Sequence, residues 1–305
     1  MGMLSSIWTF RSKPYHRIGK AGNLFIDAFD LTANLRGIGW SWSTGLKIPK
    51  ETRDTSCLPS FLLSNFYSLL VHLVLGDSFL LSVQSFDGII NSPNATIFDS
   101  SLPPIQRYLR SCLITFLTGL GIYHSIALYY TVTTMVSLIF LPEGPRNNPS
   151  QWPPLFDSPW FSTSVSEFWS MRWHQLFRNI FVKFGGVPFY ILFGRVGAVF
   201  GAFLVSGILH SVGLWGMGRG TDPIRVIGFF LMMAVGIVLE SLFKHFTNRK
   251  VGGIVGWMWS AFWIIGWGNL LVEAWLRKGL PSSVFLPDQW RPSLRLLALA
   301  KAMLA

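Results

Sequence analysis

His210 is the residue of this chain whose type and surroundings are best suited to chemistry. It ends the run Ser206-Gly-Ile-Leu-His210, inside a long apolar segment that also holds glycines at positions 197, 201, 213, 216 and 218. An ionisable side chain within an apolar segment is costly to bury, which makes it a candidate functional residue. A neutral imidazole titrates near neutral pH and can accept a proton from an alcohol. Because glycines also leave room for close helix contacts or for a substrate chain, we predict that His210 acts as a general base.

A second group of polar residues accompanies the run Phe168-Trp-Ser-Met-Arg-Trp-His-Gln175. His174 and Gln175 lie close in the sequence to Arg172 and Arg178. This density of polar side chains on a short segment favours a functional site over a plain membrane support. Guanidinium groups donate paired hydrogen bonds to phosphates. Arg172 and Arg178 are therefore candidate contacts for a phosphorylated cosubstrate, with lipid headgroups as the alternative partner.

His72, His124 and Glu240 are ionisable residues of other apolar segments. The two histidines have plain apolar or aromatic neighbours, so we expect them to face the interior of a helix bundle and to form hydrogen bonds there, without a catalytic role. Together with Glu240 they support a rival hypothesis, in which the protein is a transporter with an ion or substrate path. The inverted repeats that would favour such a transporter are not evident in the sequence.

The segment that carries His174 is expected to be an amphipathic helix at the membrane interface. Ser164 and Glu167 have the S-x-x-E spacing of a capping box, which predicts the start of this helix. His174 and Arg178, four residues apart, would share one face. Apolar residues recur at helical spacing and form a stripe on another face, namely Trp169, Trp173, Leu176, Phe177, Ile180 and Phe184.

Five apolar segments predict that the chain crosses a membrane. Half of its residues are hydrophobic and 13% are charged, whereas soluble domains carry about 25% charged residues. A helix needs about 20 apolar residues to cross the hydrocarbon core, and the lack of alternating hydrophobicity excludes a barrel. We predict an all-α fold, a polytopic transmembrane helical bundle of five spans, or six if the second segment is broken at Gly119 and Gly121. The segments comprise residues 55–76, 111–142, 196–218, 226–243 and 251–272.

Basic residues predict the orientation of the chain in the membrane. Residues 1–54 form a basic leader ahead of the membrane-embedded part, residues 55–305, and the positive-inside rule places this leader in the cytoplasm. The sequon at Asn94 would then be lumenal and open to glycosylation, with an unused sequon as the alternative. Five spans would place the basic tail after Glu273 on the opposite side, against the same rule, so the orientation of the later loops stays open.

Two further segments predict ordered structure outside the spans. Arg36-Gly-Ile-Gly-Trp40 is typical of a tight turn, because its glycines permit unusual backbone angles, and we expect this turn at the membrane surface. Six prolines lie between Pro142 and Pro159. Neither a helix nor a central strand tolerates such a density of proline, so we predict an extended, ordered loop.

The sequence also argues against several other classes of protein. It contains no CxxC, HExxH or Walker motif, so we predict no metal site. Cys57 and Cys112 are the only cysteines, which excludes a disulfide framework. The net charge of +11 is scattered over loops beside apolar segments. We therefore expect the lipid bilayer as a partner, and no nucleic acid.

Together, the two histidine motifs resemble those of a known family. The run Phe168 to Gln175, followed by the buried Ser206-Gly-Ile-Leu-His210, is similar to the wax-synthase-like branch of the membrane-bound O-acyltransferases. The turn at Arg36 and the proline-rich loop resemble the fungal members that acylate terpenoid and meroterpenoid metabolites. The resemblance implies a helix bundle in the endoplasmic reticulum membrane that encloses a chamber, with an acyl-CoA donor and a lipophilic alcohol as substrates.

The resemblance also implies roles for individual residues. His210 matches the catalytic histidine of the family, and His174 lies where the wider superfamily often has an asparagine, so both are candidate catalytic residues. Arg172, Gln175 and Arg178 are the candidate contacts of acyl-CoA. Likeness to fungal tailoring enzymes favours acetyl-CoA as the donor. A long-chain wax ester synthase, a membrane transporter and a non-catalytic scaffold are the alternatives.

Overall fold

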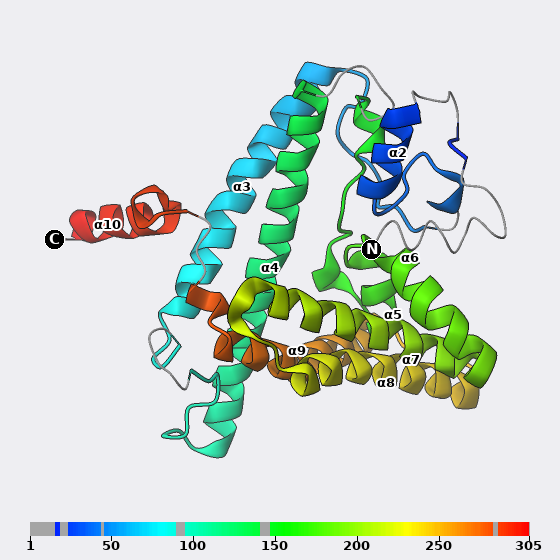
Figure 1. The fold of residues 1–305 in the computed structure, drawn as a ribbon. Coiled ribbons are helices and arrows are strands. Elements are labelled where there is room, and N and C mark those ends of the chain that lie inside the picture. Colours follow the sequence, from blue (N-terminus) through cyan, green and yellow to red (C-terminus); the bar gives the residue numbers. More distant parts are fainter. Residues whose placement is uncertain are drawn as a thin grey trace. The chain divides into compact units, whose positions relative to one another are not determined.

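Helices make up most of the described chain (Figure 1). The structure is a computed structural model and describes residues 16–18, 24–43, 46–89, 95–140, 147–282 and 286–304. Within these ranges no β-strand forms, and one isolated bridge joins Arg17 to Trp40. The predicted all-α class is confirmed.

Five long helices form the framework. Each belongs to a helical segment that is long and apolar enough to cross a membrane, and the third such segment runs from Arg178 to Gly218. The predicted polytopic bundle of five spans is confirmed. The helices are α3 (Leu58–Gln84), α4 (Pro104–Phe140), α7 (Val187–Leu214), α8 (Pro223–Thr247) and α9 (Gly253–Arg277).

Helix α4 is continuous over 37 residues, which corresponds to about 55 Å at 1.5 Å per residue. The possible break at Gly119 and Gly121 is therefore wrong, because both glycines lie within the helix. Since the hydrocarbon core is roughly 30 Å thick, a helix of this length must tilt or extend beyond it.

The chain divides into two compact units, and each long helix contributes residues to both. Unit 1 comprises residues 1–66, 130–205 and 237–260. Unit 2 comprises residues 67–129, 206–236 and 261–305.

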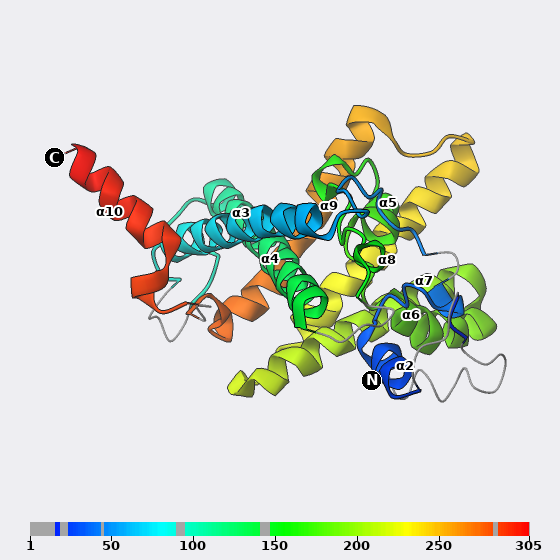
Figure 2. The same ribbon diagram turned by 90° about the horizontal axis from the view of Figure 1, so that it is seen from above.

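Helices α3 and α4 run side by side in opposite directions, as both views show (Figures 1 and 2). In unit 1, Phe61 of α3 packs in one buried cluster with Leu138 near the end of α4. In unit 2, His72 contacts His124, and Phe79 lies beside Gly121. Residues later in α3 thus meet residues earlier in α4, which is the pattern of an antiparallel pair.

The backbone reverses within α7 at Gly194, which has φ 64° and ψ −152°. A side chain strongly disfavours this region of backbone conformation, so the position favours glycine. On either side of the turn the two arms pack closely: Gly185 lies against the backbone of Gly201, and Phe189 lies against Gly197. The predicted span from Val196 therefore begins directly after a turn that the hydropathy pattern does not reveal.

In unit 1, a short helix and a turn form around one buried carboxylate. Asp30, in α2 (Leu24–Ala33), accepts hydrogen bonds from Arg17 at 2.8 Å and from the Trp40 indole at 2.7 Å. Gly37 and Gly39 both have positive φ, as the predicted tight turn requires. A side chain at Gly39 would also press on Gln151, because an added Cβ would lie 2.7 Å from its amide oxygen.

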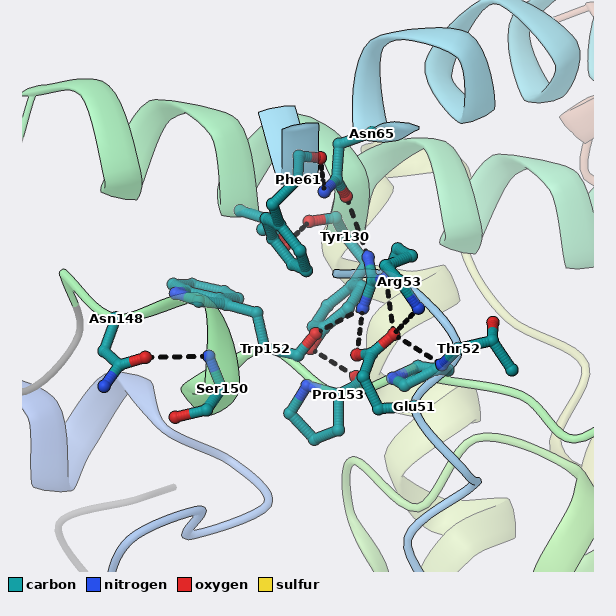
Figure 3. A network of polar contacts seen from close by, with 12 residues as sticks. Glu51, Thr52, Arg53, Phe61, Asn65, Tyr130, Asn148, Ser150, Trp152 and Pro153 are labelled. Carbon is teal, nitrogen blue, oxygen red and sulfur yellow. Dashed lines mark hydrogen bonds and ion pairs between the residues drawn. The ribbon is translucent and has the colours of Figure 1, made fainter. Parts of the chain in front are cut away.

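Two arginines hold the proline-rich loop in place. Arg53 donates to the carbonyl of Trp152 at 2.7 Å and to the Asn65 amide of α3 at 2.9 Å, and it pairs with Glu51 (Figure 3). Arg36 donates to the carbonyl of Pro153 at 2.8 Å. The prediction of order is thus confirmed for the described part of this loop, residues 147–164, because its carbonyls accept hydrogen bonds from charged donors. The loop is not extended throughout, since it contains two short 3-10 helices, Pro149–Gln151 and Pro159–Phe161.

The predicted amphipathic helix after Ser164 is interrupted. It comprises α5 (Val165–Glu167), a π-helical turn (Phe168–Arg172), a non-helical segment, α6 (Arg178–Phe181) and a second π-helical turn (Val182–Gly186) that leads into α7. Trp173 ends the first π turn in an extended conformation, with φ −78° and ψ 154°. The expectation of one continuous helix is therefore wrong, and His174 and Arg178 do not share a helical face.

In unit 2, carboxylates connect segments that are far apart in the chain. Glu273 of α9 accepts hydrogen bonds from the Thr96 hydroxyl and the Ile97 backbone and pairs with Arg277. Asp77 of α3 pairs with Arg291 at 2.8 Å, just ahead of α10 (Pro292–Leu304). Asn94, the predicted glycosylation site, lies outside the described residues.

Candidate active site

His174 lies in the non-helical segment of unit 1, within a group of aromatic rings. Its ring centroid is 5.5 Å from that of Trp173, 5.9 Å from Phe156 and 6.3 Å from Phe177. The side chain is half-buried. The packing is edge-to-face with Phe156 and Phe177 and tilted with Trp173, and such contacts restrict the orientation of the imidazole.

Gln175 shapes the backbone on which His174 lies. Its side-chain amide nitrogen donates to the carbonyl of Trp169 at 3.0 Å and to that of Trp173 at 2.9 Å. These carbonyls lie where the helix is interrupted and need donors from elsewhere. Gln175 is 4% exposed, so its hydrogen bonds are shielded from water and stabilise the non-helical conformation.

Glu240 secures the beginning of this segment from helix α8. Its carboxylate accepts hydrogen bonds from the backbone amides of Val165 at 2.6 Å and Ser166 at 3.0 Å, and from the Trp259 indole at 2.9 Å. The sequence suggested Glu240 as part of a transport path. In the structure it has a positioning role, because three donors engage a carboxylate that is only 8% exposed.

Glu167 adds a second anchor beside the capping box. Ser164 accepts a hydrogen bond from the Glu167 amide at 2.9 Å, which confirms the predicted cap. The Glu167 carboxylate accepts from the amide of Thr163 and pairs with Arg172 at 2.7 Å. Burial alone would raise the pKa of Glu167, but these hydrogen bonds and the guanidinium hold it below its ordinary value.

The three predicted cofactor contacts have different surroundings. Arg172 pairs with Glu167 and donates to the carbonyl of Asp157 at 2.9 Å. Gln175 and Arg178 instead line one small cavity of unit 1 together with Arg36. The structure thus brings two of the three predicted residues to a common cavity and gives Arg172 ion-pair and hydrogen-bond partners of its own.

Arg36 is a residue of this cavity that the sequence suggested only weakly, through its place in a glycine-rich turn. It is 6% exposed and donates to the carbonyls of Pro153 and Pro154, both at 2.8 Å, and to the Tyr130 hydroxyl. Burial lowers the pKa of its guanidinium.

His210 lies in unit 2, on helix α7. Its Nδ1 is 2.8 Å from the backbone carbonyl of Ser206, and its ring is 4.5 Å from that of Phe230. A carbonyl only accepts hydrogen bonds, so Nδ1 must carry the proton in this contact. In the neutral imidazole Nε2 is then unprotonated, which is the form that a general base requires.

His72 and His124 form a pair in unit 2. Their Nδ1 atoms are 2.8 Å apart, and Phe79 stacks on His124 with ring centroids at 5.6 Å. One imidazole donates to the other, so the prediction of hydrogen-bonded histidines is confirmed. Within the described ranges, no group of three or more His, Cys, Asp or Glu side chains could hold a metal ion.

The fold and these residues define the class: a polytopic helical membrane protein with two histidine motifs joined by one apolar segment. Residues 152–232 match the model of the membrane bound O-acyl transferase family. This match includes both His174 and His210. The predicted resemblance to this family is confirmed.

Individual relatives agree with the family match. The chain is 32% identical over 147 residues to "Acetyltransferase atnC" of Arthrinium sp, an alignment that covers 42% of this chain and 34% of the relative. It is 26% identical to "Acetyltransferase ple2" of Rhodocybe pseudopiperita, over 81% of this chain and 64% of the relative. It is 27% identical to "Long-chain-alcohol O-fatty-acyltransferase" of Simmondsia chinensis, over 42% of this chain and 39% of the relative.

The chain therefore spans between about a third and two thirds of the length of these relatives. No solved structure gives a significant match.

Proposed function

We propose that this protein is an acyl-CoA-dependent O-acyltransferase that transfers an acetyl group to a hydroxyl of a lipophilic secondary metabolite of the terpenoid or meroterpenoid class. The observation that carries this proposal is the family match over residues 152–232, which contains both histidine motifs. The acetyltransferase names of several fungal relatives support acetyl as the transferred group. We place the protein in the endoplasmic reticulum membrane, where a lipophilic alcohol can reach it through the bilayer.

In the proposed reaction, His210 acts as the general base. Its unprotonated Nε2 accepts the proton of the alcohol, and the hydroxyl oxygen attacks the thioester carbonyl of the acyl-CoA. The new C–O bond forms, the C–S bond breaks, and coenzyme A leaves as a thiolate that recovers the proton from the imidazolium. No covalent enzyme intermediate is required.

His174 is the second proposed catalytic residue. Its aromatic surroundings restrict the imidazole, which suits a residue with a fixed orientation in catalysis. The anchors at Glu240 and Gln175 would keep the backbone of this segment in place.

Orientation should contribute more to the rate than proton transfer. Holding alcohol and thioester side by side can lower the barrier by about 7–11 kcal/mol. General base catalysis contributes roughly 100- to 10,000-fold, which corresponds to about 3–5 kcal/mol.

A second candidate function is long-chain wax ester synthesis, because one relative is named as a long-chain-alcohol O-fatty-acyltransferase. Membranes containing the protein can be incubated with a panel of terpenoid alcohols and of fatty alcohols, each with acetyl-CoA or palmitoyl-CoA. We expect a product heavier by one acetyl unit on a terpenoid alcohol in mass spectrometry. Palmitoyl esters of fatty alcohols alone would favour the wax synthase, and the release of no coenzyme A from either donor would contradict both.

A further inference from the structure

A small polar cavity lies in unit 1, between the glycine-rich turn and the segment that follows His174. Its volume is about 30 Å³, which is room for about two water molecules or for one compact polar group. The cavity is too small for a whole nucleotide. Its lining residues are Leu35, Arg36, Trp42, Ser43, Leu46, Gln175, Arg178 and Asn179.

The charge of this cavity is positive and uncompensated. Arg36 and Arg178 both line it, and none of its lining residues is acidic. The hydrogen bonds of Arg36 go to neutral oxygens, those of Pro153, Pro154 and the Tyr130 hydroxyl. Among the residues that the structure describes, neither guanidinium forms an ion pair. Arg36 is buried, whereas Arg178 is exposed. Since a buried charge is costly without a counter-charge, an anion is the ligand that Arg36 favours in this cavity.

Gln175, which also lines the cavity, has a fixed orientation. Gln175 donates both hydrogens of its amide nitrogen to backbone carbonyls, which fixes the orientation of the amide group. Its amide adds no charge, so the two guanidinium groups determine the charge of the cavity.

We propose that the cavity binds a phosphomonoester, and that its source is the ribose 3′-phosphate of the acyl-CoA donor. A phosphomonoester carries about −1.5 to −2 charges at neutral pH, which matches two guanidinium groups. Arg36 and Arg178 pair with the phosphate oxygens. The assignment of the source rests on the proposed acyltransferase function.

Equilibrium binding to the full chain in nanodiscs of neutral lipid tests this assignment without depending on turnover. The probes are coenzyme A and dephospho-coenzyme A, which lacks only the 3′-phosphate. We expect the unaltered protein to bind coenzyme A about 10- to 100-fold more tightly, as the loss of hydrogen bonds between charged groups implies.

Three variants locate the effect. Arg178→Gln removes a positive charge, and Asn179→Asp adds a negative charge at nearly constant shape. Each should weaken the binding of coenzyme A about 10-fold and leave the binding of dephospho-coenzyme A almost unchanged. Lys250→Gln is the matched control, because Lys250 is an exposed cation of unit 1 that does not line the cavity. It should change neither affinity.

The remaining outcomes separate this inference from the proposed function. If the protein transfers acyl groups but Arg178→Gln and Asn179→Asp bind both probes as the unaltered chain does, the cavity assignment is overturned and the function stands. A second outcome is that coenzyme A neither binds nor supports transfer, whereas nanodiscs containing phosphatidic acid stabilise the unaltered chain but not Arg178→Gln. The source of the phosphate is then a lipid headgroup, and the assignment to the acyl donor is overturned. A chain that responds to no phosphomonoester overturns the site itself.

Discussion

His210 depends on the helix that carries it for its tautomer. The backbone carbonyl of Ser206, one helical turn earlier, accepts a hydrogen bond from Nδ1–H. The side chain of Ser206 has no part in this contact. At the scale of the residue, the helix backbone thus fixes the tautomer of the proposed base. Substitutions at His210 and at Ser206 can therefore distinguish the contribution of the imidazole from that of the serine side chain.

Replacing His210 with Ala should lower acyl transfer roughly 100- to 10,000-fold, the range of general base catalysis, while the chain stays folded in membranes. Transfer is measured as coenzyme A released per minute, with folding checked by size-exclusion chromatography in detergent. Ser206→Ala is the matched control and should retain most activity, since it preserves the carbonyl. Normal turnover by the His210→Ala chain would remove His210 from the mechanism.

At the scale of the element, the interrupted segment between Ser164 and Gly186 is held by groups outside it. One π-helical turn lies before the non-helical stretch and a second follows α6, and such turns are often associated with functional sites. Their conformation depends on Glu240 at one end and on the Gly194 reversal at the other. Each of these positions supplies a prediction.

Glu240→Ala should destabilise the segment that bears His174. It leaves two backbone amides and the Trp259 indole without their acceptor, and the loss of hydrogen bonds to a charged group costs about 1.5–3 kcal/mol each, less where water replaces them. We expect a lower midpoint of thermal unfolding in detergent and lower acyl transfer. Glu240→Gln keeps one acceptor oxygen, so its midpoint of unfolding should lie between those of the unaltered protein and of Glu240→Ala. An unchanged midpoint in Glu240→Ala would show that the carboxylate is not an anchor.

Gly194→Ala should also be destabilising, by about 1–3 kcal/mol, because its φ of 64° with ψ −152° strains any residue with a Cβ. Gly119→Ala is the control. Gly119 lies within α4, and an added Cβ would meet no atom within 4 Å, so alanine should be neutral or slightly stabilising there. Both effects are measured by thermal unfolding in the same detergent. Equal midpoints for the two variants would argue against a strained turn at residue 194.

At the scale of the whole molecule, the number of long helices determines the topology. Five crossings place the two ends of the helical region on opposite sides of the membrane. Residues before α3 and residues after α9 are both rich in Lys and Arg, so one of the two basic regions must oppose the positive-inside rule. The continuity of α4 favours this arrangement over an even number of spans.

Single cysteines introduced at Thr52 and Arg295, in a chain whose Cys57 and Cys112 are replaced by Ser, test this topology. Both positions are described residues outside the five helical segments. In sealed microsomes, a membrane-impermeant maleimide should label the cysteine at residue 52 and should label that at residue 295 only after detergent is added. Labelling of both without detergent would contradict five crossings.

The amino-acid sequence by itself determined the class of fold and the two histidine motifs, and it limited the number of spans to five or six. These follow from local properties, because lipid offers the backbone no hydrogen-bond partner and every apolar run of sufficient length must form a helix. The capping box at Ser164 is equally local, and the structure confirms it.

Only the tertiary structure decided how polar side chains are paired. Glu240 meets the amide of Val165, and Arg36 meets the carbonyl of Pro153, over separations of 75 and 117 residues. No local pattern encodes such contacts. The break at Trp173 was missed for the same reason. The apolar stripe continues through it at helical spacing, whereas the helix ends there and the Gln175 side chain donates to the carbonyls of Trp169 and Trp173.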